Sequence, residues 1–452
     1  MSDIIAAVAT GWQVSAIGII RMSGNGCIET AKKIFTPTYG SLDTAKDRSL
    51  IIGHMADKHG RLIDEVLVTA SHGPNSYTGE DTVEFQCHGS PAVLTAGLES
   101  LFAAGARQAG PGEFTKRAFL NGRMDLTQAE AVIDLIHAES TEAAANAAGQ
   151  LGGVMLRKIA PVYDSLKDIM AHFHAVLDYP DEDIDPFELD SFRDTLLSAK
   201  KNLEQLLSTY SRGQVIRHGI RAVILGKPNA GKSSFLNALA GFDRVIVTDI
   251  AGTTRDSVEE TIRLGRHTIR LVDTAGIRKT DDCIEQMGVE RAEAAAAQAN
   301  LAIYVCDGST ELSEEDMRAQ AAAFEAPLAI AVINKQDLVQ RVLPSDLPFE
   351  WVIPFCAKTG EGLEQIEAVL DTLFDDSLPC DGSILTNTRQ ADAIVRATTS
   401  ITQTIVSMDS GLTPDAVLVD VEAAMEALGE VTGQTMREEI TNRIFERFCV
   451  GK

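Results

Sequence analysis

Residues 226 to 233 read Gly-Lys-Pro-Asn-Ala-Gly-Lys-Ser and fit the pattern G-x-x-x-x-G-K-[S/T]. Glycines at these positions let backbone N–H groups turn toward phosphate oxygens, while Lys232 neutralises phosphate charge and the Ser233 hydroxyl suits Mg²⁺. An apolar run at 222–225 precedes the loop, and a helix-compatible run from Ser234 follows it. This strand–loop–helix context predicts a site for a nucleoside triphosphate.

A second motif identifies the base. Asn334-Lys335-Gln336-Asp337 directly follows the apolar run 328–333. The Asp337 carboxylate can accept hydrogen bonds from the guanine N1–H and N2–H₂, a pair of donors that adenine lacks. The nucleotide is therefore predicted to be GTP, with Cys356-Ala357-Lys358 as a later base-contact loop in which Ser is more usual than Cys at the first position.

The metal and the γ-phosphate need two further segments. Asp273-Thr274-Ala275-Gly276 follows the run 269–272, so Asp273 is placed to hold the Mg²⁺ shell through water and the Gly276 N–H to contact the γ-phosphate. The first switch segment is predicted at 248–256, where Thr254 completes the Mg²⁺ coordination. The predicted GTP contacts are Asn229, Ala230, Gly231, Lys232, Ser233, Ser234, Thr248, Asp249, Ile250, Ala251, Gly252, Thr253, Thr254, Asp273, Thr274, Ala275, Gly276, Asn334, Lys335, Asp337, Cys356, Ala357 and Lys358.

Hydrolysis requires a group that orients water. Ras-like proteins place a Gln after the Asp-x-x-Gly element, but Ile277 stands there in this chain. Glu285 is a candidate, and the alternative is a solvated Glu near the start of a helix. Arg255 lies close to the first switch, but no obvious arginine finger precedes that segment, so a cation other than Arg is expected to neutralise the charge that develops between the β and γ oxygens. Asn229 offers a carbonyl oxygen that suits a monovalent ion.

The chain of 452 residues is long enough for several domains. Residues 1–120 mix short apolar runs with turn residues and predict an α+β domain, whereas 121–215 and 379–452 are helical in pattern. Between them, 216–378 alternates strand-like and helical runs, which indicates βαβ units around a mainly parallel sheet. The simplest arrangement inserts this α/β domain into a helical domain built from both flanks.

Charge and composition limit the partners and the compartment. The formal net charge of −25 argues against general nucleic-acid binding, so any RNA contact must be local or supplied by a partner. No apolar run is long enough to cross a bilayer. The N-terminus lacks the pattern of a secretory signal, and the seven cysteines have no paired spacing, which predicts a reducing, cytoplasmic setting.

Motifs along nearly the whole chain resemble those of the MnmE (TrmE) family of tRNA uridine-modification GTPases. The likeness outside the GTP motifs rests on segments 73–81, 111–114, 117–121 and 125–131, on Glu84 with His88-Gly89, and on the ending Cys449-Val450-Gly451-Lys452. It implies a Ras-like parallel-sheet G domain, a homodimer formed through the N-terminal domains, and the FAD-dependent partner MnmG (GidA) in a heterotetramer or larger complex. It further implies that the two proteins add a carboxymethylaminomethyl-type group at C5 of the tRNA wobble uridine.

The resemblance also implies roles for particular residues. Ser233 and Thr254 would bind Mg²⁺, and Asn229, Thr248, Ile250 and Thr253 would surround K⁺. Glu285 falls where the family has its water-orienting glutamate, and Cys449 where a catalytic or redox cysteine would stand; the alternative for Cys449 is a small buried hydrophobe. A 5-formyl-tetrahydrofolate would be held by Arg21, Glu84, Arg123 and Lys452, where a carboxylate suits the pterin edge and cations suit the glutamyl tail.

Two other functions are compatible with a GTP site. The first is a GTP-dependent assembly or signalling switch without modification chemistry, which loss of switch residues would favour; none is lost. The second is a ribosome-assembly GTPase of the Era or Der kind, which would require an RNA-binding domain or a second G domain, and the sequence indicates neither.

Overall fold

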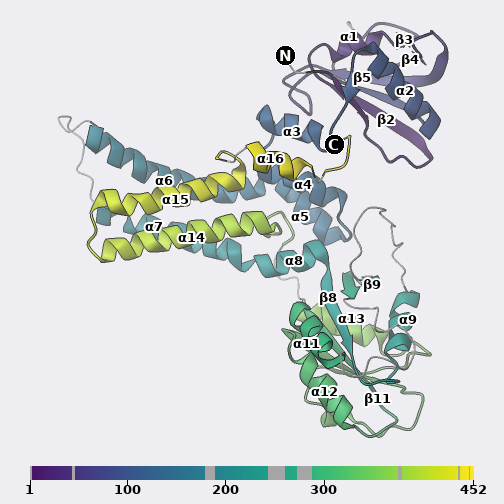
Figure 1. Cartoon of the computed structure of the whole chain (residues 1–452), viewed down its shortest axis with the longest axis vertical. Coiled ribbons are helices and arrows are strands. Elements are labelled where there is room, and N and C mark those ends of the chain that lie inside the picture. The colour runs from purple at the N-terminus through teal and green to yellow at the C-terminus, as the bar shows by residue number, and fades with distance from the viewer. Residues whose placement is uncertain are drawn as a thin grey trace. The chain divides into compact units, whose positions relative to one another are not determined.

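A computed structural model describes residues 3–42, 46–178, 189–242, 260–271, 288–374, 379–435, 438–446 and 448–451 (Figure 1). The chain forms two compact units. The first contains 1–136, 147–204 and 392–452, and the second contains 137–146 and 205–391. Within the described residues, no helix combines the length and the apolar character needed to cross a membrane.

The N-terminal part of the first unit is built on a seven-stranded sheet of order β3-β4-β5-β6-β2-β1-β7. Only the pair β1 and β7 is parallel among its strand pairs, which all lie in described residues. Helices α1 (Cys27–Lys32) and α2 (Pro91–Ala104) pack with alternate strand residues into one apolar core. The strands are β1 (Ile5–Val8), β2 (Ser15–Ser23), β3 (Phe35–Pro37), β4 (Ile51–Ala56), β5 (Leu62–Ser71), β6 (Thr82–Gly89) and β7 (Arg107–Gln108).

After this sheet, the chain forms helices both before and after the α/β segment. Within the first unit, α6 packs against α15, and Arg193 of α7 pairs with Asp409 of α14 at 2.6 Å. The helices are α3 (Glu113–Leu120), α4 (Leu126–Ile136), α5 (Thr141–Leu151), α6 (Val154–Asp178), η1 (Leu189–Phe192), α7 (Arg193–Ser208), α8 (Tyr210–His218), α14 (Thr388–Asp409), α15 (Pro414–Thr432) and α16 (Glu438–Phe445).

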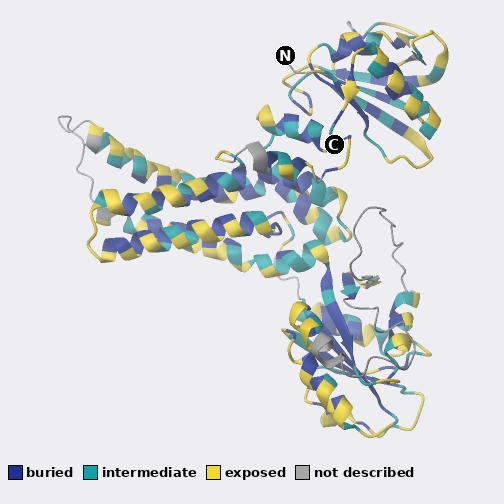
Figure 2. Cartoon of the chain, in the orientation of Figure 1, coloured by how far each residue is buried: buried dark blue, intermediate teal, exposed yellow. Residues whose placement is uncertain are grey.

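The second unit contains a six-stranded sheet of order β13-β12-β11-β8-β10-β9. It is parallel except for β9, which pairs antiparallel with β10. The strand β11 is buried along its whole length, since separate apolar cores lie on the two faces of the sheet (Figure 2). The elements are β8 (Ile220–Leu225), α9 (Lys232–Phe242), β9 (Glu260–Leu264), β10 (His267–Leu271), α11 (Gly288–Gln298), β11 (Leu301–Asp307), α12 (Glu314–Ala323), β12 (Leu328–Asn334), η2 (Pro344–Asp346), β13 (Val352–Pro354) and α13 (Leu363–Leu373).

The expected fold class is confirmed: α/β and α+β parts occur in one chain, and a mainly parallel sheet is inserted between helical segments. The apolar runs at 222–225 and 328–333 lie in β8 and β12. The antiparallel strand β9 was missed by the sequence analysis. Its alternation of polar and apolar residues before the turn at Gly265 is the signal that could have found it.

The chain segments that enter and leave the α/β sheet are bound to each other within the second unit. The buried Asn146 carboxamide accepts from the N–H of Gly382 at 3.2 Å and of Ile384 at 3.3 Å, and it donates to the Ile384 carbonyl at 3.1 Å. On α8, the Gln214 side chain donates to the Thr386 carbonyl at 2.8 Å. Gly213 of α8 lies close to the segment around Leu385, because a Cβ added at Gly213 would lie 1.9 Å from the Leu385 carbonyl oxygen.

A methyl group at Gly213 is expected to destabilise the protein although Ala usually favours helices over Gly by about 1 kcal/mol. The clash with the Leu385 carbonyl should outweigh that gain and lower the free energy of unfolding by roughly 1–3 kcal/mol in Gly213→Ala. Urea denaturation followed by circular dichroism measures it. Gly241→Ala in α9 is the matched control, because nothing lies within 4 Å of the added Cβ there; equal effects of the two changes would contradict the prediction.

Candidate GTP and folate sites

The predicted phosphate loop connects β8 to the first turn of α9. Two glycines allow the backbone of this loop to turn, since Gly226 has φ 149° and Gly231 has φ 95°. A Cβ at Gly226 would clash with the Val305 carbonyl, and a Cβ at Gly231 would clash with the Asn334 carboxamide. Asn229 is also left-handed, with φ 61°. The loop is thus a tight turn between a buried strand and a helix N-terminus, with Ser233 and Ser234 in the first turn of α9.

Lys232 directs its ammonium group back over this loop. Its Nζ donates to the Gly226 carbonyl at 2.6 Å and to the Lys227 carbonyl at 2.8 Å. Burial lowers the pKa of Lys232, since a partly desolvated ammonium group loses hydration. An anion at the loop would stabilise the charged form of Lys232, so this lysine is electrostatically suited to a phosphate group.

Asn334 joins the three nucleotide motifs. Its side chain is buried, and Nδ2 donates to the Ala230 carbonyl at 3.2 Å and to the Gly231 carbonyl at 3.5 Å. Its Oδ1 accepts from the Lys335 N–H at 2.8 Å and from the Ala357 N–H at 3.3 Å. One carboxamide therefore fixes the phosphate loop, the Asn-Lys-x-Asp turn and the Cys-Ala-Lys loop relative to one another.

Lys335 adds a second link to the phosphate loop. It has φ 66°, and its Nζ donates to the Asp307 carboxylate at 2.6 Å and to the Asn229 carbonyl at 3.2 Å. Burial by itself would raise the pKa of Asp307, but the bonds from Lys335 and Ser309 outweigh it and hold that pKa below its usual value. Asp307 is thus a charged anchor at the end of β11.

The base-contact residues lie beside Asn334, in the two loops that its side chain binds. The Lys358 ammonium group pairs with the Asp337 carboxylate and holds its pKa below the usual range. Cys356 is buried and lies at the start of the same loop, where its N–H donates to the Glu361 carbonyl at 3.0 Å. The structure brings the predicted contacts from the phosphate loop and from both base loops into one region.

The other predicted residues of the GTP site and one residue of the folate site lie outside the described residues. They are Thr248, Asp249, Ile250, Ala251, Gly252, Thr253, Thr254, Asp273, Thr274, Ala275, Gly276, Glu285 and Lys452.

Two predicted folate contacts, Arg21 and Glu84, form a pair on neighbouring strands. They are directly opposite in the register of β2 and β6, and Arg21 Nε donates to Glu84 Oε1 at 2.7 Å. The Arg21 guanidinium lies 5.3 Å from the centre of the Tyr77 ring, which belongs to the segment 73–81. Arg123 binds the same segment, since its Nε donates to the Ser76 carbonyl at 3.1 Å. Arg21 and Arg123 therefore both contact the segment 73–81, and Glu84 is linked to it through Arg21.

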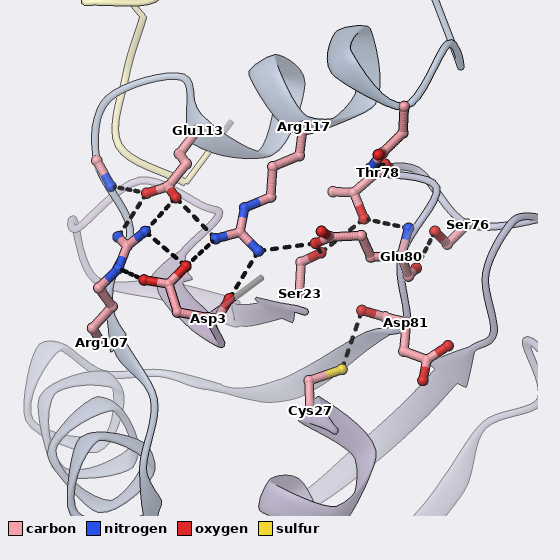
Figure 3. Close-up of polar contacts among 12 residues, drawn as sticks. Asp3, Ser23, Cys27, Ser76, Thr78, Glu80, Asp81, Arg107, Glu113 and Arg117 are labelled. Atoms are coloured by element: carbon pink, nitrogen blue, oxygen red, sulfur yellow. Dashed lines mark hydrogen bonds and ion pairs between the residues drawn. The ribbon is translucent and has the colours of Figure 1, made fainter. Parts of the chain in front are cut away.

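A network of ion pairs around the buried Arg117 supports that loop (Figure 3). The Arg117 guanidinium donates to Glu80 at 2.9 Å, to Glu113 at 3.0 Å and to the Asp3 carboxylate at 2.9 Å. Arg107 binds Glu113 from the other side, and these bonds lower the pKa of Glu113 to about 2 although burial opposes the shift. The role of Arg117 in this network could not be predicted from the 117–121 motif, because Glu80 and Asp3 lie 37 and 114 residues away in the chain.

The C-terminal segment lies against the same domain. The Gly112 N–H donates to the Cys449 carbonyl at 3.3 Å, and Pro111 forms an isolated bridge with Val450. A Cβ at Gly451 would meet the Val8 carbonyl oxygen at 2.1 Å. The Cys449 side chain is exposed in the single chain.

The phosphate loop with Lys232, held by the buried Asn334 at the edge of a mainly parallel sheet, defines a P-loop protein of the GTPase class. Family models match the chain as "GTP-binding protein TrmE N-terminus" at residues 4–123 and "MnmE helical domain" at residues 126–449. The chain belongs to the MnmE (TrmE) family, and it is a GTP hydrolase with a Ras-like G domain.

Full-length relatives named "tRNA modification GTPase MnmE" agree with this assignment. The protein from Roseiflexus castenholzii is 41% identical over 100% of this chain and 99% of its own, and that from Alkaliphilus oremlandii is 42% identical over 100% of both. The relative from Clostridioides difficile is 39% identical over 100% of both chains. The match to the solved G domain of the T. maritima FeoB iron transporter covers 35% of this chain and 100% of that chain at 22% identity, with a TM-score of 0.27.

Guanine specificity is expected to depend on the charge of Asp337. In Asp337→Asn, one carboxylate acceptor is replaced by an amide donor, so GTP affinity should fall roughly a hundredfold or more. Xanthosine triphosphate, whose base has a carbonyl in place of the guanine 2-amino group, should gain affinity because the new amide can donate to it. Competition binding with both nucleotides measures the change in relative affinity. An unchanged preference for GTP, in a variant with wild-type unfolding, would show that another residue identifies the base.

Proposed function

We propose that this GTPase uses GTP hydrolysis, together with the FAD-dependent partner MnmG (GidA), to add a carboxymethylaminomethyl-type group at C5 of the wobble uridine of tRNA. The observation that carries the proposal is the full-length likeness, at about 40% identity, to relatives named tRNA modification GTPase MnmE. The structure supports its GTP-dependent part, because the loops for phosphate and base are tied into one frame by Asn334.

The donor set of the phosphate loop fits the metals that the proposal requires. Hydroxyl and carboxamide oxygens are the ligands preferred by hard cations such as Mg²⁺ and K⁺. Ser233 with Thr254 would hold Mg²⁺, which would stabilise the charge on the β and γ oxygens. Asn229, whose left-handed backbone forms the exposed crest of the loop, would bind K⁺ with Thr248, Ile250 and Thr253.

The catalytic part of the proposal assigns water orientation to Glu285. A carboxylate there would accept a hydrogen bond from the attacking water in place of the Gln of Ras-like proteins. K⁺ would supply the charge that an arginine finger provides elsewhere, when two G domains of a homodimer meet. The exposed Cys449 is proposed as a catalytic or redox residue, since its exposure leaves the thiol open to reactants.

The open face of the N-terminal sheet supports both the homodimer and the folate site. Alternate residues of β2, β4 and β5 point away from α1 and α2, and among them Ile17, Ile52 and Leu67 are 58%, 43% and 37% exposed. Ile52 and Leu67 are cross-strand partners, so their apolar surface is continuous. Such a surface suits association with a second copy.

The folate would bind near Arg21 and Glu84 at one edge of this surface. The Glu84 carboxylate would accept from the pterin, and Arg123 and Lys452 would bind the anionic tail. We place the domain limits at 1–120, 121–215, 216–378 and 379–452, and the protein in the cytoplasm. Because the net charge is −25, tRNA would be bound mostly through MnmG.

Mass analysis of wobble uridines in tRNA from cells lacking this protein tests the proposal. The carboxymethylaminomethyl-type group should be lost, and the wild-type gene should restore it. Glu285→Ala should bind GTP normally but hydrolyse it slowly, and it should restore little of the modification. A nucleoside profile identical to that of wild-type cells would refute the proposed function.

The potassium site has a separate test. GTP hydrolysis should be faster in KCl than in NaCl at equal ionic strength, by roughly tenfold or more, because the smaller Na⁺ fits the K⁺ ligand set poorly and leaves charge on the transferring phosphoryl group less well neutralised. Steady-state phosphate release measures the ratio. Equal rates in the two salts would remove the cation from the mechanism.

A further inference from the structure

Lys227, the first variable residue of the phosphate loop, carries an ion pair that joins the loop to helix α12. Its Nζ donates to the Asp316 carboxylate at 2.8 Å and to the Thr310 hydroxyl at 3.3 Å. The Lys227 side chain is 16% exposed and that of Asp316 is 0% exposed. Because so little water reaches this pair, its charges interact more strongly than those of a surface pair.

The acceptor end of the pair is rigid. Asp316 Oδ2 accepts from the Ser313 N–H at 2.9 Å and from the Ser313 hydroxyl at 2.8 Å, and Oδ1 accepts from the Tyr304 hydroxyl at 3.1 Å. Burial by itself would raise the pKa of Asp316, but the bonds from Lys227 and Ser313 outweigh it, so the pKa lies below its usual value. The carboxylate is therefore charged and fixed at the capped N-terminus of α12.

The main chain of Lys227 in turn contacts the lysine that faces the phosphates. Its carbonyl accepts from Lys232 Nζ at 2.8 Å. Asn334 and Lys335 bind carbonyls of residues 229–231, whereas the ion pair of Lys227 acts on the loop before Pro228. A displacement of Lys227 would therefore move one of the two carbonyls that orient the Lys232 ammonium group.

We propose that Lys227 is a positioning residue for GTP: its buried ion pair with Asp316 fixes the carbonyl that aims Lys232 at the β- and γ-phosphates. Lys227 acts through Lys232 and needs no contact with the nucleotide. Since Lys232 binds phosphate oxygens in both the ground state and the transition state, loss of the ion pair should weaken nucleotide binding more than it slows the bound-state reaction. The inference rests on GTP binding alone and not on the tRNA chemistry.

The test uses the full chain with Lys227→Met, Lys227→Arg and Asp316→Asn. Lys227→Met should release a fluorescent GDP analogue roughly tenfold faster and raise KM for GTP by a similar factor, with kcat changed less than about threefold. Lys227→Arg should restore both values because it keeps a cation. Asp316→Asn should resemble Lys227→Met, and the double variant should be no worse than either single variant, since both changes remove the same contact.

Arg318→Met is the matched control, because Arg318 lies on α12 beside Asp316. Its ion pair with Glu314 is long, 3.8 Å, and exposed. This change should leave dissociation and KM unchanged. If Lys227→Met lowers Tm but matches this control in dissociation and KM, the ion pair is merely structural and the proposal is overturned. Should Lys227→Met fail to fold, unchanged dissociation in Asp316→Asn overturns it equally. A wild-type chain without GTP binding would instead refute the GTPase assignment.

Discussion

The nucleotide-binding part of this protein depends on the hydrogen bonds of one buried carboxamide. Asn334 uses both its amide nitrogen and its oxygen, so the phosphate loop and both base loops share a single reference point. A buried carboxamide without partners would cost free energy, which makes the three loops mutually dependent. Movement of one loop must therefore leave a buried polar group unpaired or carry the other loops along.

Three lysines around this hub have different tasks although their charges are the same. Lys227 and Lys335 are paired with Asp316 and Asp307, so their charges are compensated within the protein. Within the described part of the chain, Lys232 donates to the uncharged carbonyls of Gly226 and Lys227, and its pKa is lowered by burial. Lys227 and Lys335 thus fix the loop, whereas the charge of Lys232 is free to interact with a triphosphate. The site is therefore electrostatically preorganised for an anion.

Sequence patterns predicted the parts of this fold that depend on local periodicity. Apolar runs located β8 and β12, and motif order placed Lys232 and Asn334 near one site. The strand β9 was missed although its residues alternate, because only five residues carry the pattern and the segment before them has no strand-like run. The pairs Lys227–Asp316 and Arg117–Glu80 could not be predicted, since 89 and 37 residues separate their partners and neither local pattern specifies the other. The Ser-x-x-Asp at Ser313 indicates only a helix cap.

The bonds between α8 and the chain after the α/β sheet also affect how the molecule assembles. Gln214 and Thr386 are 172 residues apart in sequence, yet they are hydrogen-bonded. Once the inserted domain is folded, its two ends therefore lie as close together as the ends of a short loop. In the first unit, α6 must find α15, which is synthesised only after the insert. Early folding of the insert would shorten the effective loop that separates these helices and reduce the entropy lost when they pair. In that order of folding, the GTP-binding domain would also act as a scaffold on which the helical domain is completed during synthesis.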